Sequence, residues 1–321
     1  MAIKAPNKLP EIVKLAFAKA RANGDLTYFS TQVADLRVGN IPFQLRFSLT
    51  LANKPKGPPP QAKNNEKPFD PFAYEPRPKL FIADVGPAHY LVLNKFAITP
   101  EHFIIATKDF APQTHILEEG DLAAALECIR AYDGELFVFF NCGQHSGASQ
   151  PHRHLQLLPI SNMKDGLAPD SPWKLLASSD NIDGAPFSVF RESISTETTA
   201  AALHAAYLRL YREACLAVSN AKGWNMKEKE HETTGDAQIS YNLAMTKDTL
   251  VVCPRLSDGG PIRVSRSEEA IGSLSLNGTL LAGTALVKSE TEWNALKSDP
   301  SALEEILRTV GVPSQNQTTK L

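Results

Sequence analysis

Hydrophobic and polar residues alternate along this chain with two different periods, and the period indicates which segments form helices. Apolar residues three and four apart, such as Val13, Phe17 and Ala20, line up as one stripe on a helix. This spacing predicts helices over residues 10–22, 118–132, 198–221 and 301–310, with a short helical patch at 172–177.

Strands are predicted where short apolar runs, continuous or alternating, are bounded by turn residues. These runs lie at 79–84, 89–95, 102–107, 135–141, 187–194, 239–246 and 249–254, and a hairpin-like pair is expected at 26–36 and 41–51. Short turns of Gly, Pro and Thr-Pro join several runs, which suits antiparallel neighbours. The sequence therefore predicts an α+β fold, a mostly antiparallel sheet flanked by helices.

The length of 321 residues allows one large catalytic domain, and we expect a single domain over 1–321. The strand groups at 79–160 and 187–290 could be duplicated halves, although no repeat is detectable in the sequence. Residues 54–78 are rich in Pro, Lys and Asn and are expected to form a surface loop. The polar end, 313–321, is expected to be a disordered tail.

Composition excludes several classes of function. The formal net charge of -2 gives no broad basic field, which argues against a nucleic-acid partner. No apolar run approaches the ~20 residues of a membrane span, and residues 1–26 lack the pattern of a secretory signal. The four cysteines are far apart and are expected to be reduced thiols. We expect a cytoplasmic protein, also in the nucleus, acting as a monomer or dimer.

The strongest candidate chemistry lies at residues 146–159, directly after the predicted strand 135–141. A small, donor-rich loop, Ser-Gly-Ala-Ser-Gln, leads into His152, His154 and Gln156, which alternate with Arg153 and apolar residues. In an extended strand this period of two places both imidazoles and the amide on one face. One imidazole can attack phosphorus while loop donors hold the oxygens as charge develops.

The His-x-His-x-Gln motif after this loop resembles the transferase branch of the histidine-triad superfamily, in particular the fungal diadenosine tetraphosphate phosphorylases, or ATP adenylyltransferases. Further matching segments are Asn141-Cys142-Gly143, Leu93-Asn94-Lys95-Phe96, Gln113, Tyr241-Asn242 and Pro254-Arg255. The resemblance implies a histidine-triad-like fold. It also implies reversible phosphorolysis of diadenosine tetraphosphate by inorganic phosphate, giving ADP and ATP through an adenylyl-histidine, and a side activity on adenylyl sulfate.

The resemblance also implies roles for individual residues. His154 would be the nucleophile, its second nitrogen held by a backbone carbonyl near the loop, while His152 would orient the site. Gln156 stands where hydrolases of the superfamily carry a third histidine. The expected phosphate-binding residues are Lys54, Asn94, Lys95, Asn141, Gly147, Ala148, Ser149, Gln150, Asn277 and Lys288. His102 and His115 are expected to cap structure or to lie at the surface.

Three alternatives remain open from the sequence. The histidines could bind zinc with Cys142 as a further ligand. The motif also suits hexose-1-phosphate uridylyl transfer, and a nucleotide-binding sensor without turnover is a third reading. No carboxylate cluster resembles a metal cage, so Mg²⁺ or another divalent cation is expected to arrive with the substrate phosphates.

Overall fold

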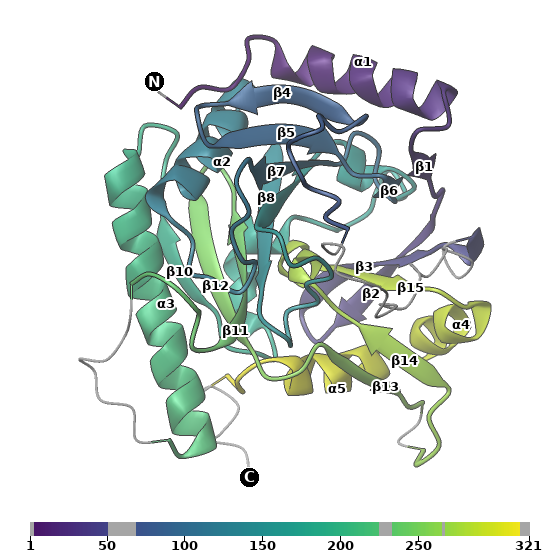
Figure 1. The fold of residues 1–321 in the computed structure, drawn as a ribbon. Helices are drawn as coiled ribbons and strands as arrows, with labels where there is room; N and C mark the ends of the chain where they lie inside the picture. Colours follow the sequence, from purple (N-terminus) through teal and green to yellow (C-terminus); the bar gives the residue numbers. More distant parts are fainter. Residues whose placement is uncertain (1–2, 51–68, 225–232, 265–266, 315–321) are drawn as a thin grey trace, which may run out of the picture.

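The fold is organised around one eight-stranded antiparallel sheet. The computed structural model describes residues 3–50, 69–224, 233–264 and 267–314. The strand order is β10-β12-β11-β8-β9-β7-β5-β4 (Figure 1). The strands are β4 (Phe81–Val85), β5 (His89–Leu93), β7 (Phe103–Thr107), β8 (Leu136–Cys142), β9 (His154–Pro159), β10 (Phe190–Ser193), β11 (Ser240–Met245) and β12 (Thr249–Arg255). This sheet confirms the predicted α+β class.

Three helices cover one face of the sheet. They are α1 (Leu9–Ala22), α2 (Glu119–Ala131) and α3 (Ala200–Lys222). Thr199 caps the start of α3, since its side chain accepts a hydrogen bond from the Ala202 N–H, and Gly223, with φ of 66°, caps its end. Strand residues such as Val138, Leu155 and Leu157 point into this apolar core. Their neighbours one position along therefore point to the other face.

The second face carries a smaller layer and the candidate site. A three-stranded sheet, β15-β3-β2, lies there with two helices and a two-stranded sheet, β13-β14 (Figure 1). These elements are β2 (Gln32–Val38), β3 (Ile41–Phe47), β13 (Gly259–Ile262), β14 (Gly272–Ser275), β15 (Thr284–Val287), α4 (Glu290–Ser298) and α5 (Ser301–Val310). The 3-10 helix η6 (Gly278–Ala282) packs against β8 and β11.

Most long elements lie where the sequence predicts them, and the short ones differ. The expected hairpin at 26–36 and 41–51 is shorter, because residues 27–28 form β1 (Thr27–Tyr28), which pairs in parallel with β6 (Phe96–Ala97). The predicted helical patch at 172–177 is wrong for most of its length. Only its last two residues belong to a 3-10 helix, η3 (Leu176–Ser178), which lies between η2 (Asn162–Lys164) and η4 (Asp180–Gly184). Strands β6, β13, β14 and β15 and helix α4 were not predicted.

In the eight-stranded sheet, the strands of the two expected halves occupy different ends and meet where β8 pairs with β11, while β13, β14 and β15 of the second half lie in the smaller sheets. Whether the halves are duplicates stays a prediction. No helix in the described parts of the chain is both long and apolar enough to cross a membrane. The expected tail falls largely at 315–321, outside the described residues.

Candidate active site

The site begins where β8 and β9 diverge, and the side chain of Gln113 bridges the gap. Gln113 Nε2 donates to the Asn141 carbonyl at 2.8 Å and to the His154 carbonyl at 3.2 Å, while Oε1 accepts from the His154 N–H at 2.8 Å. The amide thereby replaces ladder hydrogen bonds that the separating strands cannot make. It fixes the backbone at the start of the histidine motif.

His154 is held in the form that a nucleophile needs. Its Nδ1 lies 2.8 Å from the His152 carbonyl, which only accepts, so the proton is on Nδ1 and the lone pair on Nε2. Burial, together with the charge of His152, lowers the pKa of His154 to about 4 against the opposing backbone hydrogen bond. The ring is therefore neutral near neutral pH. The expected backbone-carbonyl partner is present.

His152 is fixed by a residue that sequence reasoning missed. Its Nδ1 lies 2.7 Å from Asp70 Oδ2, and its Nε2 lies 2.9 Å from both Oγ1 and the carbonyl of Thr107. Phe72 packs against His154 with ring centroids 4.7 Å apart. Both Asp70 and Phe72 belong to the expected surface loop 54–78. That prediction is wrong for 70–72, because an Asx turn and the His152 contact draw this segment onto the motif, whereas Phe69 is exposed.

Gln156 shares the face of His154, as the period of two predicts. Ile104 and Phe139 are its register partners, and Gln156 is partly exposed between the buried Leu155 and Leu157. His102 lies next to Gln156, and its Nδ1 is 3.0 Å from the Asn94 amide nitrogen. Of the two expectations for His102, the surface position is wrong, since the ring is buried beside the motif.

Asn141 is oriented by two donors so that its own donor group remains available. Its Oδ1 accepts from Asn242 Nδ2 and from the Gly278 N–H, each at 2.8 Å. Arg255, fully buried, donates to Asn242 Oδ1 and to backbone carbonyls that include Leu276 at 3.1 Å. These contacts leave Asn141 Nδ2 as the group that can hold a phosphate oxygen.

The loop after β8 is compact, and a glycine permits its close approach to Asn277. Gly147 has φ of 79°, and a Cβ there would lie 2.7 Å from the Asn277 Cβ. Asn277 therefore lies directly beside the loop and caps η6 through its bond to the Thr279 N–H at 2.9 Å. Ala148 and Ser149 are exposed, and Gln150 is partly exposed. The loop can thus present backbone and side-chain donors to an anion.

The three lysines differ in their placement. Lys54 lies outside the described residues. Lys95 is exposed after β5, with its ammonium group 5.7 Å from the centroid of the Phe96 ring. Lys288 is exposed at the end of β15, where its backbone N–H donates to Glu292 at 3.1 Å. Among the described contacts none joins Lys288 to the loop, so its substrate role stays a prediction.

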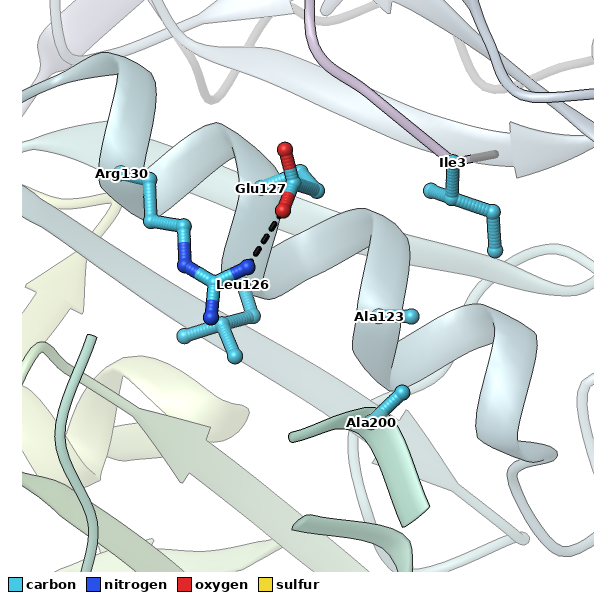
Figure 2. A pocket seen from close by; sticks show the side chains of 6 residues that line it. All are labelled: Ile3, Ala123, Leu126, Glu127, Arg130 and Ala200. Carbon is cyan, nitrogen blue, oxygen red and sulfur yellow. Dashed lines mark hydrogen bonds and ion pairs between the residues drawn. The ribbon is translucent and has the colours of Figure 1, made fainter. Parts of the chain in front are cut away.

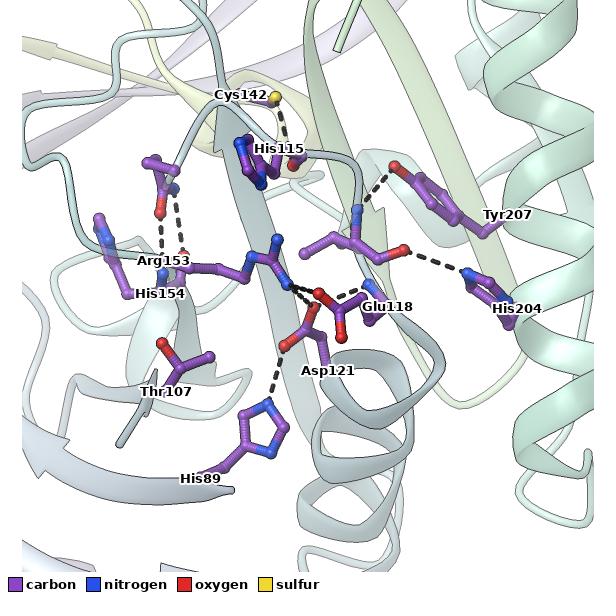
Figure 3. A network of polar contacts seen from close by, with 12 residues as sticks. His89, Thr107, His115, Glu118, Asp121, Cys142, Arg153, His154, His204 and Tyr207 are labelled. Carbon is purple, nitrogen blue, oxygen red and sulfur yellow. Dashed lines mark hydrogen bonds and ion pairs between the residues drawn. The ribbon is translucent and has the colours of Figure 1, made fainter. Parts of the chain in front are cut away.

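Behind the motif, on the helical face, a buried charged network anchors Arg153. Its Nη1 lies 2.9 Å from both Glu118 Oε1 and Asp121 Oδ2, and His89 Nε2 lies 2.8 Å from Asp121 Oδ1 (Figure 3). Asp121 is also the N3 residue of the α2 capping box, because it accepts from the Glu118 N–H. Arg153, the residue between the two motif histidines, is thereby attached to the start of α2.

The zinc alternative is not supported by the geometry. Cys142 points into the helical core near Arg153, opposite to Asn141 and His154, and burial raises the pKa of its thiol to about 12. All four cysteines are buried free thiols, as predicted. Within the described ranges no three His, Cys, Asp or Glu side chains gather as a metal site would require.

A cavity of about 220 Å³ lies elsewhere, between α2 and the N-terminal segment (Figure 2). It is lined by Ile3, Ala123, Leu126, Glu127, Arg130 and Ala200. Its charged groups, Arg130 and Glu127, pair with each other. None of these residues belongs to the histidine motif or its loop, so we assign this cavity no part in the chemistry.

Comparison with known proteins supports the assignment made from this geometry. Residues 1–176 match the family model "Ap4A phosphorylase N-terminal domain" and residues 183–313 match "ATP adenylyltransferase C-terminal domain". The chain belongs to the Ap4A phosphorylase/ATP adenylyltransferase family. It is therefore a nucleotide-binding nucleotidyltransferase, and the sensor and uridylyl alternatives lose their support.

Known proteins of this family are similar to the chain over nearly its whole length. Diadenosine 5',5'''-P1,P4-tetraphosphate phosphorylase 2 of Saccharomyces cerevisiae is 27% identical over 93% of each chain, and Protein APA1 of the same yeast is 26% identical over 96% of each. The crystal structure of yeast Ap4A phosphorylase Apa2 in complex with Ap4A superposes with a TM-score of 0.73 at 25% identity. That match covers 97% of this chain and 99% of the other. The histidine-triad-like fold is thereby confirmed.

Replacing Gln113 by leucine is expected to lower turnover about 10–100-fold, the usual cost of losing a residue that orients reacting groups. The variant leaves the His154 N–H and the Asn141 carbonyl unpaired, so the nucleophile moves. Steady-state kinetics measure the effect. Thr114→Val, which removes only an exposed hydrogen bond to Asp236, is the control. Equal rates in the two variants would contradict the positioning role.

Acid is expected to destabilise the fold through two buried histidines. Burial lowers the pKa of His154 to about 4 and that of His102 to about 3, against about 6.5 in the unfolded chain. As the pH falls below about 6.5, the unfolded chain takes up protons that the folded chain excludes, so stability falls. From about pH 7 to pH 5 we expect a loss of roughly 2–4 kcal/mol in urea unfolding. In His102→Leu the loss should be about half as large, and an unchanged pH dependence would contradict the assignment.

Proposed function

We propose that this enzyme splits diadenosine tetraphosphate with inorganic phosphate into ADP and ATP, through a covalent adenylyl group on His154. The observation that carries the proposal is the state of His154. Its Nδ1–H is held by the His152 carbonyl and its ring is neutral, which leaves Nε2 as a free nucleophile. A neutral imidazole in a fixed tautomer is the form that attacks phosphorus.

In the first step His154 Nε2 attacks the phosphorus that carries one adenosine. The new bond is N–P, and the bond that breaks joins this phosphorus to the bridging oxygen of the remaining triphosphate, which leaves as ATP. Asn141 Nδ2 and the donors of Gly147, Ala148, Ser149 and Gln150 would hold the phosphate oxygens as charge develops. Lys54, Asn277, Lys95 and Lys288 would add contacts to the polyphosphate.

Gln156 suits a leaving group that needs no proton. An amide can hold a phosphate or bridging oxygen by a hydrogen bond, but it cannot deliver a proton as an imidazolium can. ATP is already stable as an anion, so protonation is not required. In the second step an oxygen of inorganic phosphate attacks the adenylyl phosphorus, ADP is released and His154 regains its lone pair. The same steps in reverse would synthesise the dinucleotide.

Two further features follow from this scheme. Adenylyl sulfate would react in the same way, because sulfate is also a stable leaving anion. The described residues offer no carboxylate cage for Mg²⁺. We therefore propose that a divalent cation comes with the nucleotide phosphates as part of the substrate, and none of the steps above depends on it.

Product analysis tests the reaction. The enzyme is incubated with diadenosine tetraphosphate with and without inorganic phosphate, and nucleotides are separated by ion exchange. We expect ADP and ATP in equal amounts, and only when phosphate is present. ATP with AMP in the absence of phosphate would show that water takes the adenylyl group. That result would overturn phosphorolysis.

A further inference from the structure

Three polar side chains form a line beside the histidine motif, and the mechanism uses only the last of them. Asn94 follows β5, His102 precedes β7 and Gln156 lies on β9, the next strand of the sheet. The backbone N–H of Asn94 also donates to the His102 carbonyl at 3.0 Å, so the first two residues are locked together. This line ends at the amide that meets the substrate phosphates, and the inference therefore rests on the proposed function.

The orientation of the Asn94 amide is fixed by its own chain. The Phe96 N–H lies 2.9 Å from Asn94 Oδ1, and a backbone N–H can only donate. The oxygen of the amide is therefore on the Phe96 side. The nitrogen, Nδ2, faces His102, where Nδ1 is the nearer ring atom at 3.0 Å and Nε2 lies at 3.5 Å.

This contact decides which nitrogen of His102 carries the proton. An amide nitrogen donates and does not accept, so His102 Nδ1 accepts and the proton lies on Nε2. The ring is buried at 6% exposure, and burial lowers its pKa to about 3. A neutral ring has one donor and one acceptor, so the chain of hydrogen bonds has a single direction.

Gln156 is the register partner of Ile104, and Phe103 points to the helical face, so the His102 side chain shares the face of Gln156 and lies diagonally across from it. We propose that the ring, whose Nδ1 is occupied by Asn94, donates from Nε2 to Gln156 Oε1. Asn94 and His102 would thereby orient Gln156 so that its NH₂ group faces the substrate phosphates. An inverted amide would present its oxygen to a phosphate anion, which repels it. His102 is thus a positioning residue.

Nitrogen NMR of the free enzyme tests the tautomer without any turnover. In protein labelled with ¹⁵N-histidine, the His102 ring, assigned by its loss in His102→Gln, should carry its proton on Nε2. His154 should carry its proton on Nδ1 and serves as the internal reference. In Asn94→Asp the carboxylate accepts from the ring, so the His102 proton should move onto Nδ1. A proton on Nδ1 in the wild type, or no change in Asn94→Asp, would overturn the proposal.

A pair of variants tests the consequence for catalysis. In His102→Gln the side-chain amide can still donate to Gln156, whereas His102→Leu cannot. We expect kcat to fall about 10–100-fold in His102→Leu, with KM for phosphate little changed, and to recover to within a few-fold of wild type in His102→Gln. Equal kcat values in the two variants would overturn the proposal. A wild type without phosphorolysis would instead refute the proposed function, and the tautomer result would still stand.

Discussion

Replacing His154 by alanine is expected to lower turnover by at least about 10³-fold, because the attacking nitrogen is lost while phosphate binding remains. The residues that would hold the phosphates, Asn141 and the 147–150 loop, do not depend on the imidazole for their contacts. Single-turnover kinetics with diadenosine tetraphosphate measure the loss. A variant that retains wild-type rates would contradict the mechanism.

Two further substitutions at this position separate chemistry from packing. In His154→Asn the amide Nδ2 can keep the hydrogen bond to the His152 carbonyl, yet it offers no nucleophile. We expect this variant to be folded and as inactive as His154→Ala. In His154→Gly, added imidazole should restore part of the turnover by entering the vacated space. If His154→Asn were active, the imidazole would not be the nucleophile, and His154 would serve the structure of the site instead.

The second large effect concerns stability: Asp121→Asn is expected to lower the free energy of unfolding by about 3–5 kcal/mol. Asp121 is 1% exposed and Arg153 is 2% exposed. Without the carboxylate charge, the buried guanidinium keeps only Glu118 as an anionic partner. The single oxygen of the new amide can accept from Arg153 or from His89, but not from both. Urea unfolding measures the change.

Glu118→Gln is the matched control, because it makes the same chemical change at the other partner of the same Arg153 nitrogen. The Glu118 side chain is 70% exposed, so its pair should contribute less than about 1 kcal/mol. The two variants differ mainly in burial. Similar losses of unfolding free energy in both variants would contradict the view that burial makes the Asp121 contact the more stabilising of the two.

Local patterns predicted the long elements well. Helices α1, α2, α3 and α5 each carry an apolar stripe, and the apolar runs of β5, β7, β8 and β12 are strands in the structure. Strands β13 and β14 were missed because Gly259, Gly260 and Pro261 read as turn residues. Helix α4 has few apolar residues, but its capping box, Ser289 with Glu292, was a usable signal.

The sequence predicted the part of the site that lies on one strand, β9, and on the loop before it. The period of two placed His154 and Gln156 on one face, and the small loop suggested an anion site. Asp70, Phe72 and His102 reach the motif only through tertiary contacts, which depend on strand register and on how a polar segment folds back. No periodicity in the sequence encodes those contacts.

Trapping the covalent intermediate tests the central claim most directly. The enzyme is incubated with diadenosine tetraphosphate labelled at the phosphorus that carries adenosine, without inorganic phosphate, so that ATP leaves and the adenylyl group stays. Intact mass and peptide mapping locate the adduct. We predict one acid-labile adenylyl group per chain, on His154, absent from His154→Asn and released as ADP when inorganic phosphate is added. An enzyme that turns over but never carries the label, or carries it on another residue, would contradict the account.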